Sequence, residues 1–449
     1  MRGGEDRIFD REVGRKGTHL YVLTLFRTIR ITFAILSPVM KDQTISHEAV
    51  RVKSWLPWIL LALAVLFVGL SFVPRARQRC IFPYDELCDY RMFILPTMQS
   101  GRLYEPEGIH AHDACYPPIA YCAVRALVSD RGEKWNLTCG EMQLLASIFV
   151  MQALAALLLV RKFQSNSLRV VLGFVIIMSP SCICSVLRGN PSGWAFALVC
   201  AFLAWYRSEN RFLRVIAAVA LGMATALKIA PCLFGVLYLS DVFRKPRRIP
   251  AFEILVSVFS AAFLVFVPFL FWGGTDSITQ WMANARANAA FYSVRCPIWG
   301  FVGFANHFVD SSELILPSAV WFAAATRIFS GVLVVVSLLA RRTYLKLLFI
   351  GSALAFTTHH DYGGAYLLPA FIAWLDASET VQGAHSGLGL LLEAVAWTVI
   401  VTPLQVPNPC RPGTMNALLQ NEFLFVLLTS AFVRLIAERR LSGFCNRFK

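Results

Sequence analysis

Residues 55–74 read WLPWILLALAVLFVGLSFVP, a run without a charged side chain. An α-helix needs about 20 such apolar residues to cross the hydrocarbon core of a bilayer. The whole chain has a similar character, because 57% of its 449 residues are hydrophobic and only 15% are charged. A soluble domain carries roughly 25% charged residues. The sequence therefore predicts an all-α polytopic membrane protein.

Together with further apolar stretches, this run predicts a bundle of about twelve transmembrane helices. Several of the stretches are short and need flanking residues to cross the bilayer. A shorter apolar stretch at 117–128 is expected to form a juxtamembrane or re-entrant helix. The candidate spans lie at residues 55–74, 141–160, 168–187, 191–206, 212–228, 229–243, 251–272, 321–340, 344–358, 362–376, 386–404 and 421–438.

Basic clusters between the apolar stretches predict the orientation in the membrane. Cytoplasmic loops carry an excess of Lys and Arg, and a cytoplasmic N-terminus places every cluster on that side. Both termini are then cytoplasmic. Residues 1–54 form a basic cytoplasmic tail, 55–440 the membrane domain, and 75–140 a partly helical first extracytoplasmic loop. The clusters are Arg161–Lys162, Arg207–Arg214, Arg244–Arg248, Arg341–Arg342 and Arg439–Arg440.

The net charge of +15 is therefore spread over short clusters that meet membrane lipid headgroups. No single basic stripe is present, which argues against nucleic acid as a partner.

Polar residues from separate segments are predicted to meet at the extracytoplasmic side. Placing an ionisable residue in a membrane costs free energy, so such a residue by default marks a functional site. Two carboxylates follow the first span, a polar turn joins two later spans, a lysine interrupts an apolar run, and two histidines end another span. In that order these are Asp85 and Asp89, Arg188 and Asn190, Lys228, and His359 and His360.

These residue types suit the transfer of a group from a phosphate to a hydroxyl. A carboxylate can take the hydroxyl proton as general base, Arg and Lys can hold a phosphate, and histidine can move a proton near neutral pH. Structural alternatives remain for each residue. Either aspartate could cap a loop helix or pair with Arg91, and the two cations could extend to the interface. The histidines could be half of a metal site, but no third ligand at helical spacing supports a metal.

The same stretches resemble glycosyltransferase family 87, a family of membrane enzymes with the GT-C fold. The resemblance covers roughly residues 55–375, and the motifs come in the family's order. Asn190 stands where the family commonly has Gln. The matching stretches are Asp89–Phe93, Gly101–Pro106, Tyr116–Pro118, Leu187–Pro191, Ala226–Pro231, Thr358–Tyr362 and Leu367–Pro369.

The resemblance implies an inverting transferase that needs no metal or cofactor and uses a polyprenyl-phosphate-linked sugar, with mannose as the sugar expected by analogy. Asp89 would be the catalytic base, with Asp85 as the alternative, and His359 or His360 would assist. Arg188 and Lys228 would hold the donor phosphate. The residues expected to bind substrate are Tyr104, Tyr116 and Asn190.

The resulting hypothesis is a mannosyltransferase of the plasma (inner) membrane with an extracytoplasmic active site. Its acceptor would be a lipid-linked molecule or another glycan. Two rival hypotheses are a secondary transporter or lipid flippase and a non-catalytic scaffold. Transporters often show repeats and charges near the bilayer midplane, whereas this sequence has no visible repeat and its charges gather near one surface. A scaffold would have little reason to keep this set of Asp, Arg, Lys and His on one face.

Overall fold

The computed structural model describes residues 46–71, 87, 89–95, 116–128, 139–244, 250–271, 274–295, 299–301, 316–358, 361–376, 387–402 and 415–445. Helices are the only regular elements within these ranges, which confirms the all-α prediction. Most of the predicted N-terminal tail lies outside the described residues. The assignment of residues 1–54 and 55–440 to a tail and a membrane domain stays a prediction.

The described elements fall into two halves of the chain. The first half contains α2 (Ser46–Ser71), the π-helix η3 (Asp89–Ile94), α5 (Pro118–Leu127), α6 (Cys139–Val160), α7 (Asn166–Ile177), α8 (Pro180–Leu187), α9 (Ser192–Trp205) and α10 (Arg211–Leu227). The second half contains η4 (Ala230–Gly235), α11 (Val236–Arg244), α12 (Ala251–Phe271), α13 (Gly274–Arg295), α15 (Leu316–Leu339), α16 (Thr343–Thr358), η5 (Asp361–Leu367), α17 (Leu368–Leu375), α19 (Gly387–Val401) and α20 (Met415–Cys445).

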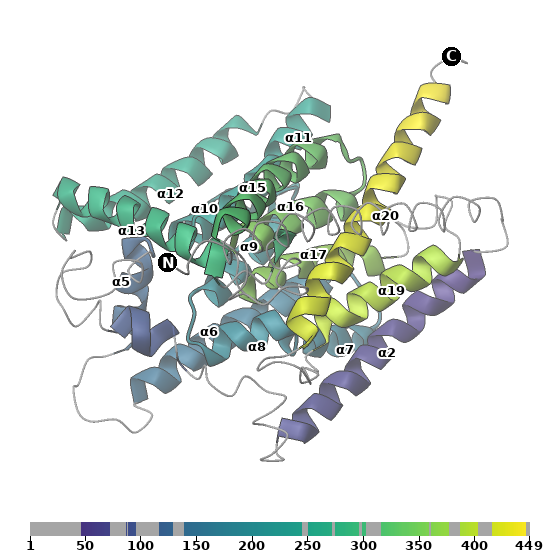
Figure 1. Cartoon of the computed structure of the whole chain (residues 1–449), viewed down its shortest axis with the longest axis horizontal. Coiled ribbons are helices and arrows are strands. Elements are labelled where there is room, and N and C mark those ends of the chain that lie inside the picture. The colour runs from purple at the N-terminus through teal and green to yellow at the C-terminus, as the bar shows by residue number, and fades with distance from the viewer. Residues whose placement is uncertain are drawn as a thin grey trace, which may run out of the picture.

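Helices α16 and α17 form the centre of the bundle (Figure 1). Every residue from Tyr344 to Phe356 is buried, and so is every residue of α17. Helix α16 packs against α15, η5, α17, η4 and α20. These helices are apolar all round because they are enclosed by other helices.

Two groups of helices flank this centre (Figure 1). Helices α2, α19 and α20 pack together on one side, and α10 packs against α9 and α12 on the other. Gly222 lets α10 approach α12 closely, since a Cβ there would lie 2.6 Å from the Ser257 carbonyl oxygen. The helix pair could not keep this spacing around a larger residue.

The predicted count of about twelve spans is not confirmed. Each of the twelve stretches overlaps a described helix, but only five of these helices are long and apolar enough to cross a membrane. A sixth results if α7 and α8 form one span bent by 53°. Other apolar helices have 10–17 residues, and at 1.5 Å per residue they reach at most about 26 Å, less than the roughly 30 Å of a hydrocarbon core.

The predicted first extracytoplasmic loop contains helices where it is described. The apolar stretch at 117–128 folds as α5, a single short helix, as expected. It joins η3 and the start of α6 in a second hydrophobic cluster, separate from the central one. The large members of this cluster are Tyr90, Tyr116, Tyr121, Trp194, Phe269 and Trp281. Tyr90 and Leu227 of this cluster are sequence neighbours of Asp89 and Lys228, two of the polar residues described next.

Candidate active site

The turn between α8 and α9 provides most of the polar groups of the candidate site. Helix α8 ends at Leu187, Arg188 is its C-cap, and the backbone N–H of Asn190 donates to the Ser185 carbonyl at 2.9 Å. Gly189 adopts a φ of +64°, and a Cβ on it would lie 3.0 Å from the Cβ of Tyr90. The backbone conformation therefore favours glycine here, and a Cβ would also be in tight contact with Tyr90.

The segment that carries Asp89 docks on this turn through its backbone. Leu87 N–H donates to the Leu187 carbonyl at 2.6 Å, and Tyr90 N–H donates to the Arg188 carbonyl at 3.2 Å. Leu87 has a φ of 57°, an unusual conformation for a residue other than glycine. Asp89 follows as the first residue of η3. Short π-helical turns are frequent at functional sites.

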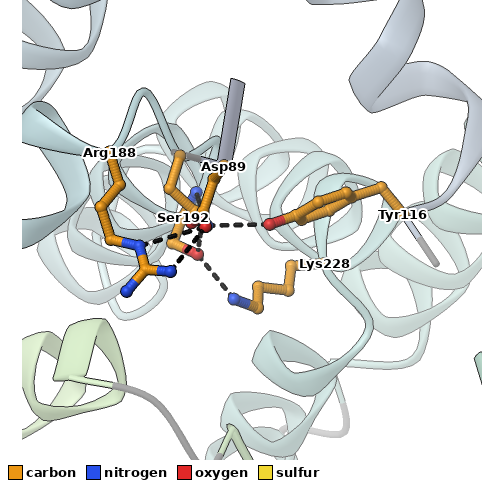
Figure 2. Close-up of polar contacts among 6 residues, drawn as sticks. Asp89, Tyr116, Arg188, Ser192 and Lys228 are labelled. Atoms are coloured by element: carbon orange, nitrogen blue, oxygen red, sulfur yellow. Dashed lines mark hydrogen bonds and ion pairs between the residues drawn. The ribbon is translucent and has the colours of Figure 1, made fainter. Parts of the chain in front are cut away.

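Asp89 is held by an arginine and an amide (Figure 2). Its Oδ1 lies 3.1 Å from Arg188 Nε and 2.9 Å from Arg188 Nη2. Its Oδ2 accepts a hydrogen bond from Asn190 Nδ2. The residue is only 3% exposed. A carboxylate with two oxygens has about four acceptor positions, so these three bonds leave room for one further donor.

Asn190 connects Asp89 to two more side chains. Its Nδ2 also donates to Tyr116 Oη at 2.8 Å. Its Oδ1 accepts from the Ser192 N–H at 2.8 Å and from Ser192 Oγ at 2.5 Å. Asn190 is completely buried. The two donors on its oxygen fix the orientation of the amide, which aims its nitrogen at Asp89.

Lys228 completes the chain of contacts. Helix α10 ends at Leu227, and Lys228 follows in an extended conformation before Pro231 in η4. Its Nζ donates to Ser192 Oγ at 2.6 Å. Figure 2 shows Arg188 and Tyr116 on two sides of Asp89, with Lys228 approaching through Ser192. One polar chain therefore runs from Arg188 through Asp89, Asn190 and Ser192 to Lys228, and we call it the Asp89 network.

An ion pair beside the Asp89 network fastens η3 to α6. Arg91 Nε lies 2.8 Å from Glu141 Oε1, and Arg91 Nη2 lies 3.0 Å from Glu141 Oε2. Glu141 is 1% exposed. Paired N–H donors on one carboxylate give a strong and directional contact. This pair therefore fixes the segment that carries Asp89 to the start of α6.

The structure brings together five of the residues that were predicted from the sequence. These are Asp89, Tyr116, Arg188, Asn190 and Lys228. Asp85, Tyr104, His359 and His360 lie outside the described residues, so their placement stays a prediction. Within the described ranges, no group of three His, Cys, Asp or Glu side chains could hold a metal ion.

Sequence reasoning missed Ser192 and Glu141. Ser192 begins an apolar helix, where a serine is ordinary, and only its contacts with Asn190 and Lys228 distinguish it. Glu141 lies in the first turn of α6, where an acidic residue is also ordinary. A sequence signal exists for Ser192 only in its position two residues after Asn190.

Comparison with known proteins identifies one family. A family model described as glycosyltransferase family 87 matches residues 115–359, more than half of the chain. The matched region includes Tyr116, the α8–α9 turn and Lys228, and it begins after Asp89. No curated protein and no solved structure matches the chain.

Proposed function

Because the chain belongs to glycosyltransferase family 87, we propose that the Asp89 network is its active site and that Asp89 is the catalytic base. A glycosyltransferase must remove a proton from an acceptor hydroxyl and stabilise a leaving group. The network links one carboxylate to two cations from different elements, directly to Arg188 and through Asn190 and Ser192 to Lys228. This arrangement is the observation that carries the proposal.

In the proposed reaction, the acceptor hydroxyl oxygen attacks the anomeric carbon of the donor sugar. The new glycosidic bond forms as the bond from that carbon to the phosphate oxygen breaks, and the phosphate leaves with the electron pair. The hydroxyl proton passes to Asp89. A single displacement of this kind inverts the anomeric configuration. Direct proton transfer to a positioned carboxylate contributes typically about 10²–10⁴-fold.

Arg188 and Lys228 would stabilise the charge that develops on the leaving phosphate. Arg188 already lies against Asp89, and Lys228 reaches the same network through Ser192. Positive groups held in place before the reaction stabilise developing negative charge without reorganisation. A guanidinium has five N–H donors, so Arg188 can contact Asp89 and a phosphate together. His359 or His360 would assist on the acceptor or phosphate side, and Tyr104 would bind substrate.

The proposed donor is a polyprenyl-phosphate sugar, with mannose as the first sugar to test. Several helices are long and apolar enough to embed the protein in a membrane. With both termini cytoplasmic, the Asp89 network would face the opposite side of the plasma membrane, away from cytoplasmic nucleotide sugars. A lipid-linked donor would then be required, and the acceptor would be a lipid-linked or other glycan.

The experiment is a transfer assay with the purified protein in liposomes. Labelled polyprenyl-phosphate mannose and labelled nucleotide-linked mannose are offered separately with candidate glycolipid acceptors. Label is expected in the acceptor only with the polyprenyl donor. Transfer from the nucleotide sugar at an equal rate would refute the lipid donor. Movement of lipid or solute across the membrane without any sugar transfer would favour a transporter or flippase.

A further inference from the structure

A cavity of about 200 Å³ lies where α6, α9, α16 and α17 meet, and the proposed reaction does not use it. Most of its lining is apolar. The larger aliphatic side chains are Leu158 and Leu159 of α6, Leu203 of α9, Leu347 of α16, and Pro369 and Ile372 of α17. The volume is below the roughly 300 Å³ of small drug-sized pockets, so it suits part of an acyl chain better than a whole ligand.

The cavity lies far along the bundle from the Asp89 network. Helix α6 begins beside η3, where Glu141 holds Arg91, and ends next to Arg161 at the cavity. With 22 residues, α6 is about 33 Å long at 1.5 Å per residue, close to the thickness of a hydrocarbon core. Helix α9 likewise begins at Ser192 and ends near the cavity. If α6 crosses the membrane, the two sites lie at opposite ends of this span.

Two cations line the cavity beside its apolar walls. Arg161 donates one N–H to the Ala204 carbonyl, and a guanidinium has five such donors. Lys162 Nζ lies 3.1 Å from Asp376 Oδ2, and the two side chains are 39% and 33% exposed. Exposed ion pairs of this kind contribute little, so an incoming phosphate can compete for Lys162. Both cations stand at the end of a candidate span.

The helix that supplies Leu158 and Leu159 to the cavity also exposes leucines on its surface. Leu157 and Leu154 are exposed on α6, about one and two turns before Arg161. Exposed leucines in a candidate span are expected to contact acyl chains. A chain that enters the cavity from this surface would bring its own headgroup to Arg161 and Lys162. The charge of these residues favours an anionic headgroup.

We propose that this cavity binds an anionic phospholipid, with its acyl chain among the leucines and its phosphate at Arg161 and Lys162. Such a lipid would come from the leaflet opposite the Asp89 network, so it would not be the sugar donor. The proposal therefore stands independently of the proposed reaction.

The test is lipid binding by the purified full-length protein. After delipidation in detergent, native mass spectrometry compares phosphatidylglycerol with phosphatidylcholine of the same acyl chains. Phosphatidylglycerol should bind more tightly. Arg161→Gln/Lys162→Gln should weaken it about 25-fold, since each basic residue near an anionic lipid contributes roughly a factor of five. Arg211→Gln is the matched control, because Arg211 starts α10, stacks on Phe252 at 5.2 Å and does not line the cavity.

A second variant leaves both charges in place. Leu203→Trp fills the cavity and should also weaken phosphatidylglycerol, which decides the question if the double variant does not fold. Glycerol 3-phosphate, which has no acyl chains, should not compete. The proposal would be overturned if the protein bound both phospholipids equally or if glycerol 3-phosphate displaced phosphatidylglycerol. It would also be overturned if either folded variant bound phosphatidylglycerol as tightly as the original protein.

Discussion

Replacing Asp89 with Asn keeps the shape of the side chain but removes the charge and the proposed base. The transfer rate should fall by about 10²–10⁴-fold, the usual contribution of a general base. The same change leaves the partly buried Arg188 without the Asp89 carboxylate at 2.9 Å. Breaking a buried ion pair on one side costs about 3–5 kcal/mol of stability. A fall in activity must therefore be separated from a loss of folded protein.

Glu253→Gln is the matched control for that separation. Glu253 pairs with Arg214 at 2.8 Å, and the side chains are 9% and 19% exposed, against 4% and 17% for Asp89 and Arg188. This variant should lose comparable stability, while each folded molecule keeps its activity. Transfer from labelled polyprenyl-phosphate sugar is measured in liposomes and divided by the amount of monodisperse protein.

The double variant Asp89→Asn/Arg188→Gln distinguishes catalysis from ion pairing. Removing both charges leaves no unpaired ion, so part of the lost stability should return, whereas transfer should stay absent. Recovery of transfer in the double variant would mean that Asp89 serves only to neutralise Arg188. Transfer by Asp89→Asn above about a tenth of the original rate would also exclude a general base of ordinary effect.

Three further changes probe the rest of the network. Ser192→Ala removes the hydroxyl that accepts a hydrogen bond from the Lys228 ammonium. It should lower kcat/KM about 10-fold or more, since hydrogen bonds to charged groups contribute about 1.5–3 kcal/mol. Ser192→Thr keeps a hydroxyl and should lower kcat/KM less in the same assay, and equal losses would argue against the bond. Lys228→Met should raise KM for the donor more than Lys228→Arg, whereas an unchanged KM in both would remove Lys228 from phosphate binding. Gly189→Ala should lower the unfolding temperature, because a φ of +64° costs a residue with a Cβ roughly 1–2 kcal/mol; an unchanged temperature would contradict the strain at this turn.

The sequence predicted where helices form better than it predicted which of them span the membrane. Helices α16 and α17 are as apolar as a span, but their side chains are buried against other helices. In contrast, α12 exposes Leu255, Phe259 and Phe263. Hydropathy measures how apolar a stretch is and does not distinguish protein from lipid as the neighbour. The count of spans was therefore the least predictable part of the fold.

Prediction of the site depended on how chemically distinctive each residue is. Placing a charged residue beside an apolar run at a membrane costs free energy. Asp89, Arg188 and Lys228 could therefore be selected from the sequence. Ser192 carries no such cost at the start of a helix. Its position in the network follows from the fold of the α8–α9 turn, which places its N–H and Oγ on the Asn190 oxygen.

The Asp89 network joins two parts of the chain that differ in their relation to the family. The cations and the amide lie within the matched residues 115–359, whereas Asp89 comes from a segment before them. That segment is attached to the α8–α9 turn by two backbone hydrogen bonds, from Leu87 and Tyr90. The ion pair with Arg188 and the Arg91–Glu141 pair add the side-chain anchors. Asp89 thus helps to hold its own segment on the turn, so its replacement can lower activity through lost structure as well as through lost catalysis. The Glu253 control and the double variant are needed to separate these two effects.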